Sequence, residues 1–397
     1  MAGFVEIVSD AVNEKADCLN ALGRYLWDNP ETAMEEFKAH ERISDFLESE
    51  GFSVQRNYII PTAFRAAFGG KTFGRTRVVF MCEYDALPDI GHACGHNLMA
   101  ECAVAAGIAV KKVLQRDPSL VGKVVVLGTP AEEALLGKVH LLRGGSFDDA
   151  AFALIAHPTL RNDPCPSTSG LLKMNVEFKG KAAHAGSVPW KGINALDAAM
   201  GAYTFVAMLQ RRMRHVWKIV ASITDGGSAP NVIPDMTKLE YDLWAPNFKQ
   251  LVRLKERVEA CVTSGGDGAG CVTKITLKGR MLKDVMAVST LTNVYQKNAE
   301  SLGMKFRQAD KERTPEVVTD AGNVSYVVPM IRPIFGLDTQ ADINTKEFAE
   351  AAGTSDALDR SLVAARALAL TIIEVMRSPA LYKEIREEFL AMKSKAS

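Results

Sequence analysis

The sequence predicts an α/β fold: a larger domain built on a mainly parallel sheet, with a smaller α+β domain inserted into it. Three nearly continuous apolar runs, "TRVVFMC", "GKVVVLG" and "AFALIA", alternate with helical segments in the first part of the chain. Such runs are typical of strands that are buried on both faces of a parallel sheet. A change to strictly alternating strands after residue 170 predicts the inserted domain.

The first helical segment, "VEIVSDAVNEKADCLNALGRYLWDNP", carries helix-spaced apolar residues and is predicted to end at Pro30. The second, "EEFKAHERISDFLESEGF", is amphipathic, and Gly51 is its predicted C-cap. A third helix is predicted over residues 98–114, between the first two apolar runs. Helices and strands therefore alternate along this part of the chain, as a layered α/β domain requires.

Polar residues follow each of the three apolar runs. Glu83 and Asp85 follow the first, Glu132 and Glu133 the second, and His157 the third. The carboxyl ends of parallel strands are where open α/β sheets bind ligands. Any one of these residues alone is equally consistent with a solvated loop, but three strand ends of this kind favour one shared site.

The segment "HPTLRNDPCPSTSG" has the composition of a linker. After it, "LLKMNVEFKGK" and "KLEYDLW" alternate apolar and polar residues, as in antiparallel strands with one wet face, and helices are predicted near 194–213 and 247–264. The predicted domains are therefore 1–169 and 283–397, together forming the larger domain, and 170–282. The last predicted helix is "DALDRSLVAARALALTIIEVM".

The overall composition excludes several classes of protein. The chain has 397 residues, with 47 basic and 47 acidic side chains, so its formal net charge is zero and it has no general attraction to nucleic acid or anionic membranes. No apolar run approaches the ~20 residues of a membrane span. The beginning of the chain lacks a secretory signal pattern, and the seven scattered cysteines lack disulfide spacing. We therefore expect a cytoplasmic protein that binds neither nucleic acid nor membrane.

The stretch "GHACGHN" places Cys94 and His96 just before a predicted helix, with His92 close by. Thiolate, imidazole and carboxylate groups are the ligands of zinc and related metals. The loop is therefore a candidate metal site together with the acid pair Glu132 and Glu133 and with His157. His92 is expected to be structural. Paired acids suit a metallohydrolase, because one can bind metal while the other moves a proton. A cysteine nucleophile activated by a histidine is the alternative, but it gives the acid pair no role.

The motifs "YDALPDIGHACGHN", "GTPAEE", "AHP", "GKAAHAGSVPWKGINALDA", "NVIPD" and "DAGNVSYVVP" follow one another in an order that resembles the aminoacylase/carboxypeptidase-type zinc amidohydrolases. Members of this metallopeptidase family carry an inserted dimerisation lid. The sequence is most similar to the branch with a cysteine ligand, which includes aminobenzoyl-glutamate hydrolase and Xaa-Arg/β-alanyl-lysine-type dipeptidases. The resemblance implies a phosphorylase/hydrolase-like catalytic domain, a ferredoxin-like lid, and a homodimer formed through the lid.

The resemblance also implies roles for residues of the larger domain. Cys94 matches a thiolate that bridges two divalent metals, zinc or manganese. Glu132 matches the general base and acid, and Asp85 matches an acid that helps to orient the metal-site residues. The further metal ligands implied are His96, Glu133 and His157.

Two lid residues match functional positions of the family. His184 matches a histidine that reaches the partner's active site and steadies the developing oxyanion. Asn231 matches a substrate-contacting asparagine. From the residues alone, the structural interpretations are favoured: His184 would cap a turn after a strand, and Asn231 would be a turn residue before Pro234.

Two positions depart from the family pattern. The last metal ligand of the family is a histidine, but the matching segment "INTKEF" has Asn344, whose amide oxygen is a poor zinc ligand, and no histidine follows residue 215. Asp342 is a possible substitute.

The second departure is Trp244, which stands where close relatives carry an arginine. Alternation places Trp244 on the same face as Glu240, where it would meet substrate or pack at a dimer contact.

These departures leave two functional hypotheses. In the first, the protein is a metal-dependent amidohydrolase that cleaves an N-acyl amino acid or dipeptide-like substrate with altered specificity, and one of its metal positions is weak or empty. In the second, it is a metal-deficient homologue that has lost hydrolysis and forms amides in biosynthesis or only binds. Metal content distinguishes the two hypotheses.

Overall fold

The computed structural model describes residues 2–69, 77–133, 136–306 and 317–396. These residues divide into two compact units. The first contains the described residues up to 166 together with 285–306 and 323–395, and the second contains 167–284 and 317–322. The domain limits predicted from the sequence, 169/170 and 282/283, stay predictions.

The first unit is built around a six-stranded sheet with the strand order β1-β2-β4-β3-β5-β13. Strands β4, β3, β5 and β13 run parallel, whereas β2 is antiparallel to both of its neighbours. The strand limits are β1 Ser53–Arg56, β2 Phe64–Gly69, β3 Arg77–Cys82, β4 Lys123–Gly128, β5 Phe152–Leu154 and β13 Met330–Ile331. The three apolar runs are thus β3, β4 and β5, and the predicted α/β class with a mainly parallel sheet is confirmed.

A second, short parallel pair joins β6 (His157–Thr159) to β14 (Ile334–Gly336). It continues the chain directions of β5 and β13 beyond the main sheet, and it brings the 157–159 segment next to a segment that lies far away in the sequence. This pairing is what fixes the position of His157.

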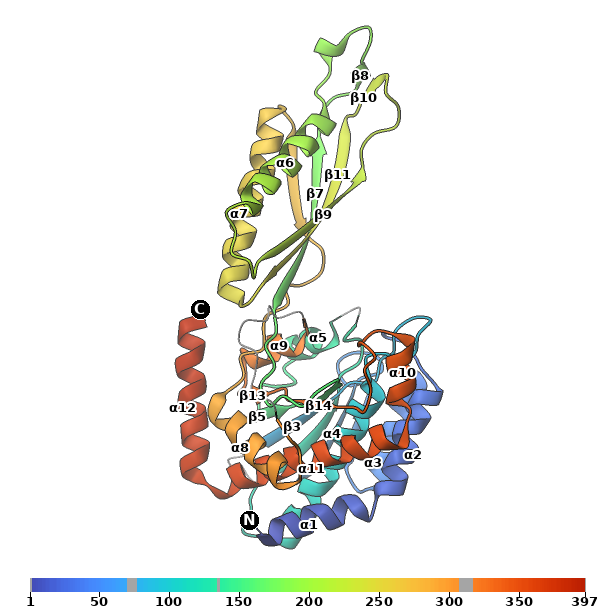
Figure 1. Ribbon diagram of the computed structural model, residues 1–397, viewed down its shortest axis with the longest axis vertical. Coiled ribbons are helices and arrows are strands. Elements are labelled where there is room, and N and C mark those ends of the chain that lie inside the picture. The colour runs from blue at the N-terminus through green and yellow to red at the C-terminus, as the bar shows by residue number, and fades with distance from the viewer. Residues whose placement is uncertain (1, 70–76, 134–135, 307–316, 397) are drawn as a thin grey trace. The chain divides into compact units, whose positions relative to one another are not determined.

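Helices pack around the sheet of the first unit (Figure 1). The long helix α4 is almost entirely buried and contacts α1, α2 and α11 as well as strands β3 and β4. The helices of this unit are α1 Ala2–Asn13, α2 Ala16–Asp28, α3 Phe37–Ser49, α4 His96–Arg116, α5 Gly137–Arg143, α8 Ser289–Ser301, α10 Lys346–Ala352, α11 Ser355–Arg377 and α12 Pro379–Ala396, and α9 (Ala321–Ser325) crosses the sequence boundary between the units. None of the described helices is long and apolar enough to cross a membrane.

Two sequence expectations about helices differ in detail from the structure, and a third agrees with it. The predicted first helix is two helices, α1 and α2, separated at Glu14 and Lys15. The predicted last helix is α11, but a further helix, α12, follows it after Ser378. Gly51 follows α3 with a φ of 80°, so the predicted glycine end of that helix is present.

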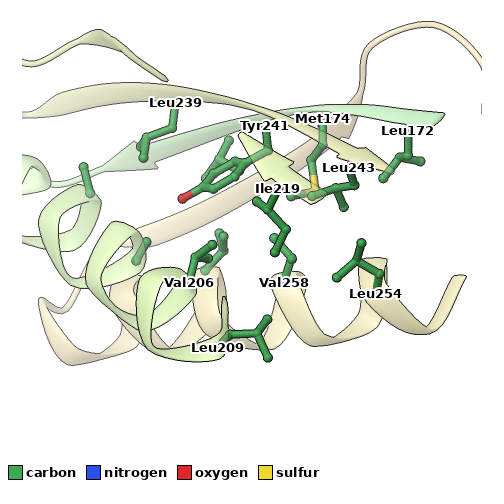
Figure 2. Packing of buried hydrophobic residues seen from close by; sticks show 14 of the residues in the cluster. Leu172, Met174, Val206, Leu209, Ile219, Leu239, Tyr241, Leu243, Leu254 and Val258 are labelled. Atoms are coloured by element: carbon green, nitrogen blue, oxygen red, sulfur yellow. The ribbon is translucent and has the colours of Figure 1, made fainter. Parts of the chain in front are cut away.

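The second unit is a four-stranded antiparallel sheet, order β12-β7-β11-β9, with α6 and α7 packed on one face. Figure 2 shows apolar side chains of β7 and β11 pointing toward those of the two helices, for example Tyr241 and Met174 toward Val206 and Val258. A separate two-stranded antiparallel pair, β8 with β10, belongs to the same unit. The element limits are β7 Gly170–Lys179, β8 Ala183–His184, the 3-10 helix η1 Pro189–Lys191, α6 Ala195–Gln210, β9 Lys218–Asp225, β10 Val232–Ile233, β11 Met236–Ala245, α7 Phe248–Gly268 and β12 Val272–Leu277.

Strand β11 shows why the alternation in the sequence was informative. Leu239, Tyr241 and Leu243 are buried, while Glu240 and Trp244 are partly exposed on the other face. The apolar face lies on the helices and the polar face does not, which matches the predicted one-face-wet strand.

Candidate metal and catalytic site

The candidate site of the first unit lies at the carboxyl ends of β3, β4 and β5. The chain leaves β3 at Cys82, turns through Gly91 and Gly95, which have φ values of 64° and 79°, and enters α4 at His96. Only residues that tolerate left-handed backbone adopt such angles without strain, so the two glycines allow the tight loop that carries Cys94.

The thiol of Cys94 and the imidazole of His157 are in contact. The sulfur lies 3.3 Å from Nε2 of His157. The Nδ1 atom of His157 donates to the carbonyl of Pro158 at 2.7 Å, which leaves Nε2 as the atom that faces the sulfur. Burial raises the pKa of the Cys94 thiol to about 12. Burial, followed by the charges of Arg332 and His96, lowers the pKa of His157 well below its ordinary value.

Asp85 orients the His96 ring. Nδ1 of His96 donates to the backbone oxygen of Asp85 at 2.8 Å and to its carboxylate Oδ1 at 3.0 Å. The other carboxylate oxygen accepts from the backbone N–H of Glu133 at 3.0 Å. Burial alone would raise the pKa of Asp85, but the charge and hydrogen bond of His96 together with the Glu133 N–H hold it below its ordinary value. One carboxylate thus ties the loop after β3 to the His96 ring and to the loop after β4.

The Nε2 atom of His96 faces oxygen atoms without a hydrogen bond to any of them. Glu83 Oε2 lies 3.3 Å away and Glu133 Oε1 lies 3.9 Å away. Among the described residues, neither His96 Nε2 nor Glu133 Oε1 has a hydrogen-bond partner, although both are buried. A buried nitrogen and buried carboxylate oxygens that converge in this way fit a cation held between them.

Two sets of possible ligand atoms lie within 4.8 Å of one another in this unit. The first consists of Cys94, His96 and His157, and the second of His96, Glu132 and Glu133. The structure therefore brings together all four predicted metal ligands and the predicted base. Their roles stay predictions, but their proximity fits a divalent metal.

His92 makes its hydrogen bond outside this cluster. Its Nε2 donates to the carbonyl of Leu26 at 3.0 Å, and burial lowers its pKa to about 3. A neutral imidazole that bonds to a helix carbonyl is a structural group, which is the role expected for this histidine from the sequence.

Asn344 reaches the site through its backbone. Its N–H donates to the carbonyl of Ala93 at 2.9 Å, next to Cys94 in the chain. Its φ is 67°, which asparagine tolerates better than most residues, and the residue is exposed. The segment is thus correctly placed beside the ligand loop, while its side chain is not an imidazole.

The predicted lid residues His184 and Asn231 are neighbours in the second unit. Val232 pairs with His184 in the antiparallel pair of β8 and β10, and the Asn231 carbonyl accepts from Ala185 N–H at 2.9 Å. Nδ1 of His184 accepts from the backbone N–H groups of Gly186 and Ser187, both at 3.2 Å. The turn-capping interpretation of His184 is therefore correct, and it leaves the exposed ring with Nε2 for another partner.

Two buried cations near the site were missed by the sequence analysis. Lys138 is fully buried and its Nζ lies 2.7 Å from Glu83 Oε1. Arg332 lies just after β13 and is also buried. The signal in each case was a single basic residue inside an apolar segment, "LLGKVHLL" and "VVPMIRPIF".

Comparisons with known proteins relate this chain to peptidases and hydrolases. A family model described as a peptidase dimerisation domain matches residues 167–268. Over 392 residues the chain is 39% identical to the Xaa-Arg dipeptidase of Mus musculus, which covers 96% of this chain and 91% of that protein. It is 33% identical over 319 residues to a component of the p-aminobenzoyl-glutamate hydrolase of Escherichia coli (strain K12), with 75% of this chain and 64% of that protein covered.

Solved structures share the fold. The YXEP protein of Bacillus subtilis, described as a dinuclear metal-binding peptidase of the M20 family, has a TM-score of 0.70 and 21% identity, with 91% of this chain and 99% of that chain covered. An aminobenzoyl-glutamate utilization protein from Klebsiella pneumoniae has a TM-score of 0.68 and 17% identity, with 92% and 98% covered.

The fold, the site and these relatives define a hydrolytic enzyme. The chain belongs to the M20 peptidase family with a dimerisation domain, which confirms the resemblance drawn from its motifs.

Proposed function

We propose that the protein is a metal-dependent amidohydrolase that cleaves the amide bond of a dipeptide or an N-acyl amino acid. The observation that carries the proposal is the convergence of Cys94, His96 and His157, whose ligand atoms lie within 4.8 Å of one another. A thiolate and two imidazoles suit zinc better than magnesium or calcium, which prefer oxygen ligands. Three protein ligands also leave a coordination position open for water or substrate, as catalytic zinc sites do.

We infer that one metal position is strong and a second is weak or empty. The set of Cys94, His96 and His157 does not involve Asn344. A second position beside Glu133 would depend on the segment of Asn344, where an exposed amide replaces the imidazole found in the family. The donor set therefore supports one zinc per chain, with manganese as the alternative metal.

When bound, the metal supplies Lewis acidity to the scissile carbonyl and to a water. Glu132 is the residue that takes the proton from this water and returns it to the leaving amine. Its carboxylate belongs to the second ligand-atom set, within 4.8 Å of the His96 ligand atom. Asp85 holds the His96 ring so that Nε2 faces the site, as carboxylates behind metal-bound histidines do.

We propose a homodimer formed through the second unit. The matched dimerisation domain lies in this unit. Its helix α6 exposes four large apolar side chains, and strand β9 is an unpaired edge of the sheet with Val220 and Ile223 exposed. The exposed residues of α6 are Met200, Tyr203, Phe205 and Met208. Such a surface is usually covered by a partner. In this dimer His184 of one subunit would donate to the oxyanion in the site of the other.

The substrates named for the relatives define the assay. The purified protein is analysed for bound metal and tested on Ala-Arg, on other dipeptides, on N-acyl amino acids and on p-aminobenzoyl-glutamate. We expect about one zinc per chain, turnover of at least one of these substrates, and loss of turnover after chelation that zinc restores. A protein that binds no metal and cleaves none of them after metal addition would be the metal-deficient homologue instead.

A further inference from the structure

Arg332 is held beside the strand end that carries His157. The carbonyl before it, that of Ile331, accepts from the N–H of Ile155 at 3.3 Å. The carbonyl after it, that of Pro333, accepts from the N–H of His157 at 3.1 Å. These two backbone hydrogen bonds fix Arg332 opposite the residues that lead into the ligand cluster.

The guanidinium of Arg332 is buried, and the part of the chain that the structure describes supplies no counter-ion to it. The residue is 5% exposed, and among the described residues its Nε has no hydrogen-bond partner and no carboxylate lies within 4.0 Å of the group. Lys138, the other buried cation near the site, is paired with Glu83 at 2.7 Å. Arginine does not lose its charge by deprotonation, so burial without a partner is unfavourable unless an anion arrives.

The backbone position of Arg332 places it beside the candidate metal site. Pro333, the next residue, accepts the hydrogen bond from the N–H of His157. The imidazole of His157 lies 3.3 Å from the Cys94 sulfur. An anion bound by Arg332 would therefore lie close to a substrate bond that is positioned at this cluster.

We infer that Arg332 binds the carboxylate of the substrate and so determines specificity for amides that have a free carboxylate near the scissile bond. This inference rests on the proposed function, because dipeptides and N-acyl amino acids share such a carboxylate. A guanidinium matches a carboxylate with two parallel N–H donors, which fixes orientation as well as charge. The bound carboxylate would be the counter-ion of Arg332 that the described residues do not provide.

The test compares Ala-Arg with its C-terminal amide, in which the carboxylate charge is removed. The variants are Arg332→Gln, which removes the charge, and Arg332→Lys, which keeps it but loses the fork of donors. Arg143→Gln is the matched control, because Arg143 is an exposed arginine at the end of α5 in the same unit. For Ala-Arg we expect kcat/KM to fall about 10- to 100-fold in Arg332→Gln and by less in Arg332→Lys. For the amide we expect a change of less than about twofold, and no change for either substrate in the control.

An equal loss for both substrates would overturn the inference, since it would indicate a role on the oxyanion or in folding. Unchanged kinetics for both would also overturn it. Binding is measured by calorimetry in the Glu132→Gln background, so it does not depend on turnover. There, a preference for the free acid over the amide that Arg332→Gln abolishes supports the inference even if no hydrolysis is found, and equal affinities in the parent protein contradict it.

Discussion

Cys94 Sγ and His157 Nε2 lie 3.3 Å apart although 63 residues separate them in the chain. The first sits on the loop before α4, and the second at the start of β6, which is held by its pairing with β14. Three segments of the first unit, the loop before α4 and the strands β6 and β14, must therefore be in place before these two atoms meet. Metal affinity, metal content and catalytic rate can each be measured separately at this site.

Metal binding should release protons, because burial raises the pKa of the Cys94 thiol to about 12. At pH 7 the metal-free sulfur holds its proton, and the metal must displace it to gain a thiolate ligand. Zinc affinity should therefore rise with pH between pH 6 and 8, by about tenfold per unit for each proton displaced. Calorimetry in buffers of different ionisation enthalpy counts the protons. Cys94→Ser should lower that number and the affinity, whereas the exposed Cys18→Ser should change neither; an affinity independent of pH would contradict the prediction.

Glu132→Gln should lower kcat by about 10²- to 10⁴-fold, since the amide side chain cannot take up the proton of the attacking water. Metal content should stay at the wild-type value, because the set of Cys94, His96 and His157 is untouched. Initial rates and metal analysis of the same preparation provide the measurement. Glu347→Gln, an exposed position on α10, is the control. If Glu132→Gln lost its metal as well, Glu132 would be a ligand and not the base.

Asn344→His should create a second metal position. The backbone N–H of Asn344 already bonds to the carbonyl of Ala93, so an imidazole at position 344 would lie close to the loop that carries Cys94. We expect the zinc content to rise from about one to about two per chain. Lys346→His, an exposed histidine two residues further on, should leave the content unchanged. About two metals in the wild-type protein would show that Asn344 does not weaken the second position.

Glu101→Gln should stabilise the protein at neutral and alkaline pH. Glu101 is buried in α4 and accepts from the hydroxyl of Ser361 at 2.5 Å, and burial raises its pKa well above the ordinary value of 4.5. A raised folded-state pKa favours the folded protein fully below pH 4.5, and this contribution is lost as the pH rises toward the folded-state pKa. Thermal unfolding at pH 4 and pH 8 should therefore show little difference at pH 4 and a Tm higher by a few degrees for the variant at pH 8, on the order of 1 kcal/mol. A lower Tm for the variant at pH 8 would contradict the prediction, since it would mean that a cation or a hydrogen-bond donor stabilises the ionised Glu101 carboxylate.

Much of the fold could be predicted from periodicity. Strands of the parallel sheet are buried on both faces, so their sequences are continuous apolar runs. Strands of the second unit are buried on one face only, so their sequences alternate apolar and polar residues. The break between α1 and α2 was not predicted, since apolar spacing continues across Glu14 and Lys15.

The proximity of the candidate ligands was predictable, because they lie at the ends of neighbouring parallel strands and in the compact motif "GHACGHN". Their role as ligands stays a prediction. The double role of Asp85 was not predictable, because it depends on where the Glu133 N–H lies in three dimensions. Arg332 was not predicted as a site residue, because it is a single basic residue within an apolar segment. Its importance follows from the counter-ion that the described residues do not provide, which is a property of the folded surroundings and not of the residue.

Gly95 shows how the site is prepared. Its φ is 79°, and a Cβ built on it would lie 2.5 Å from Cγ of Pro158, the residue that follows His157. A glycine therefore lets the two segments that carry the candidate ligands Cys94 and His157 pack directly on one another. Any side chain at position 95 would have to push Pro158 aside, and with it His157, away from the Cys94 sulfur.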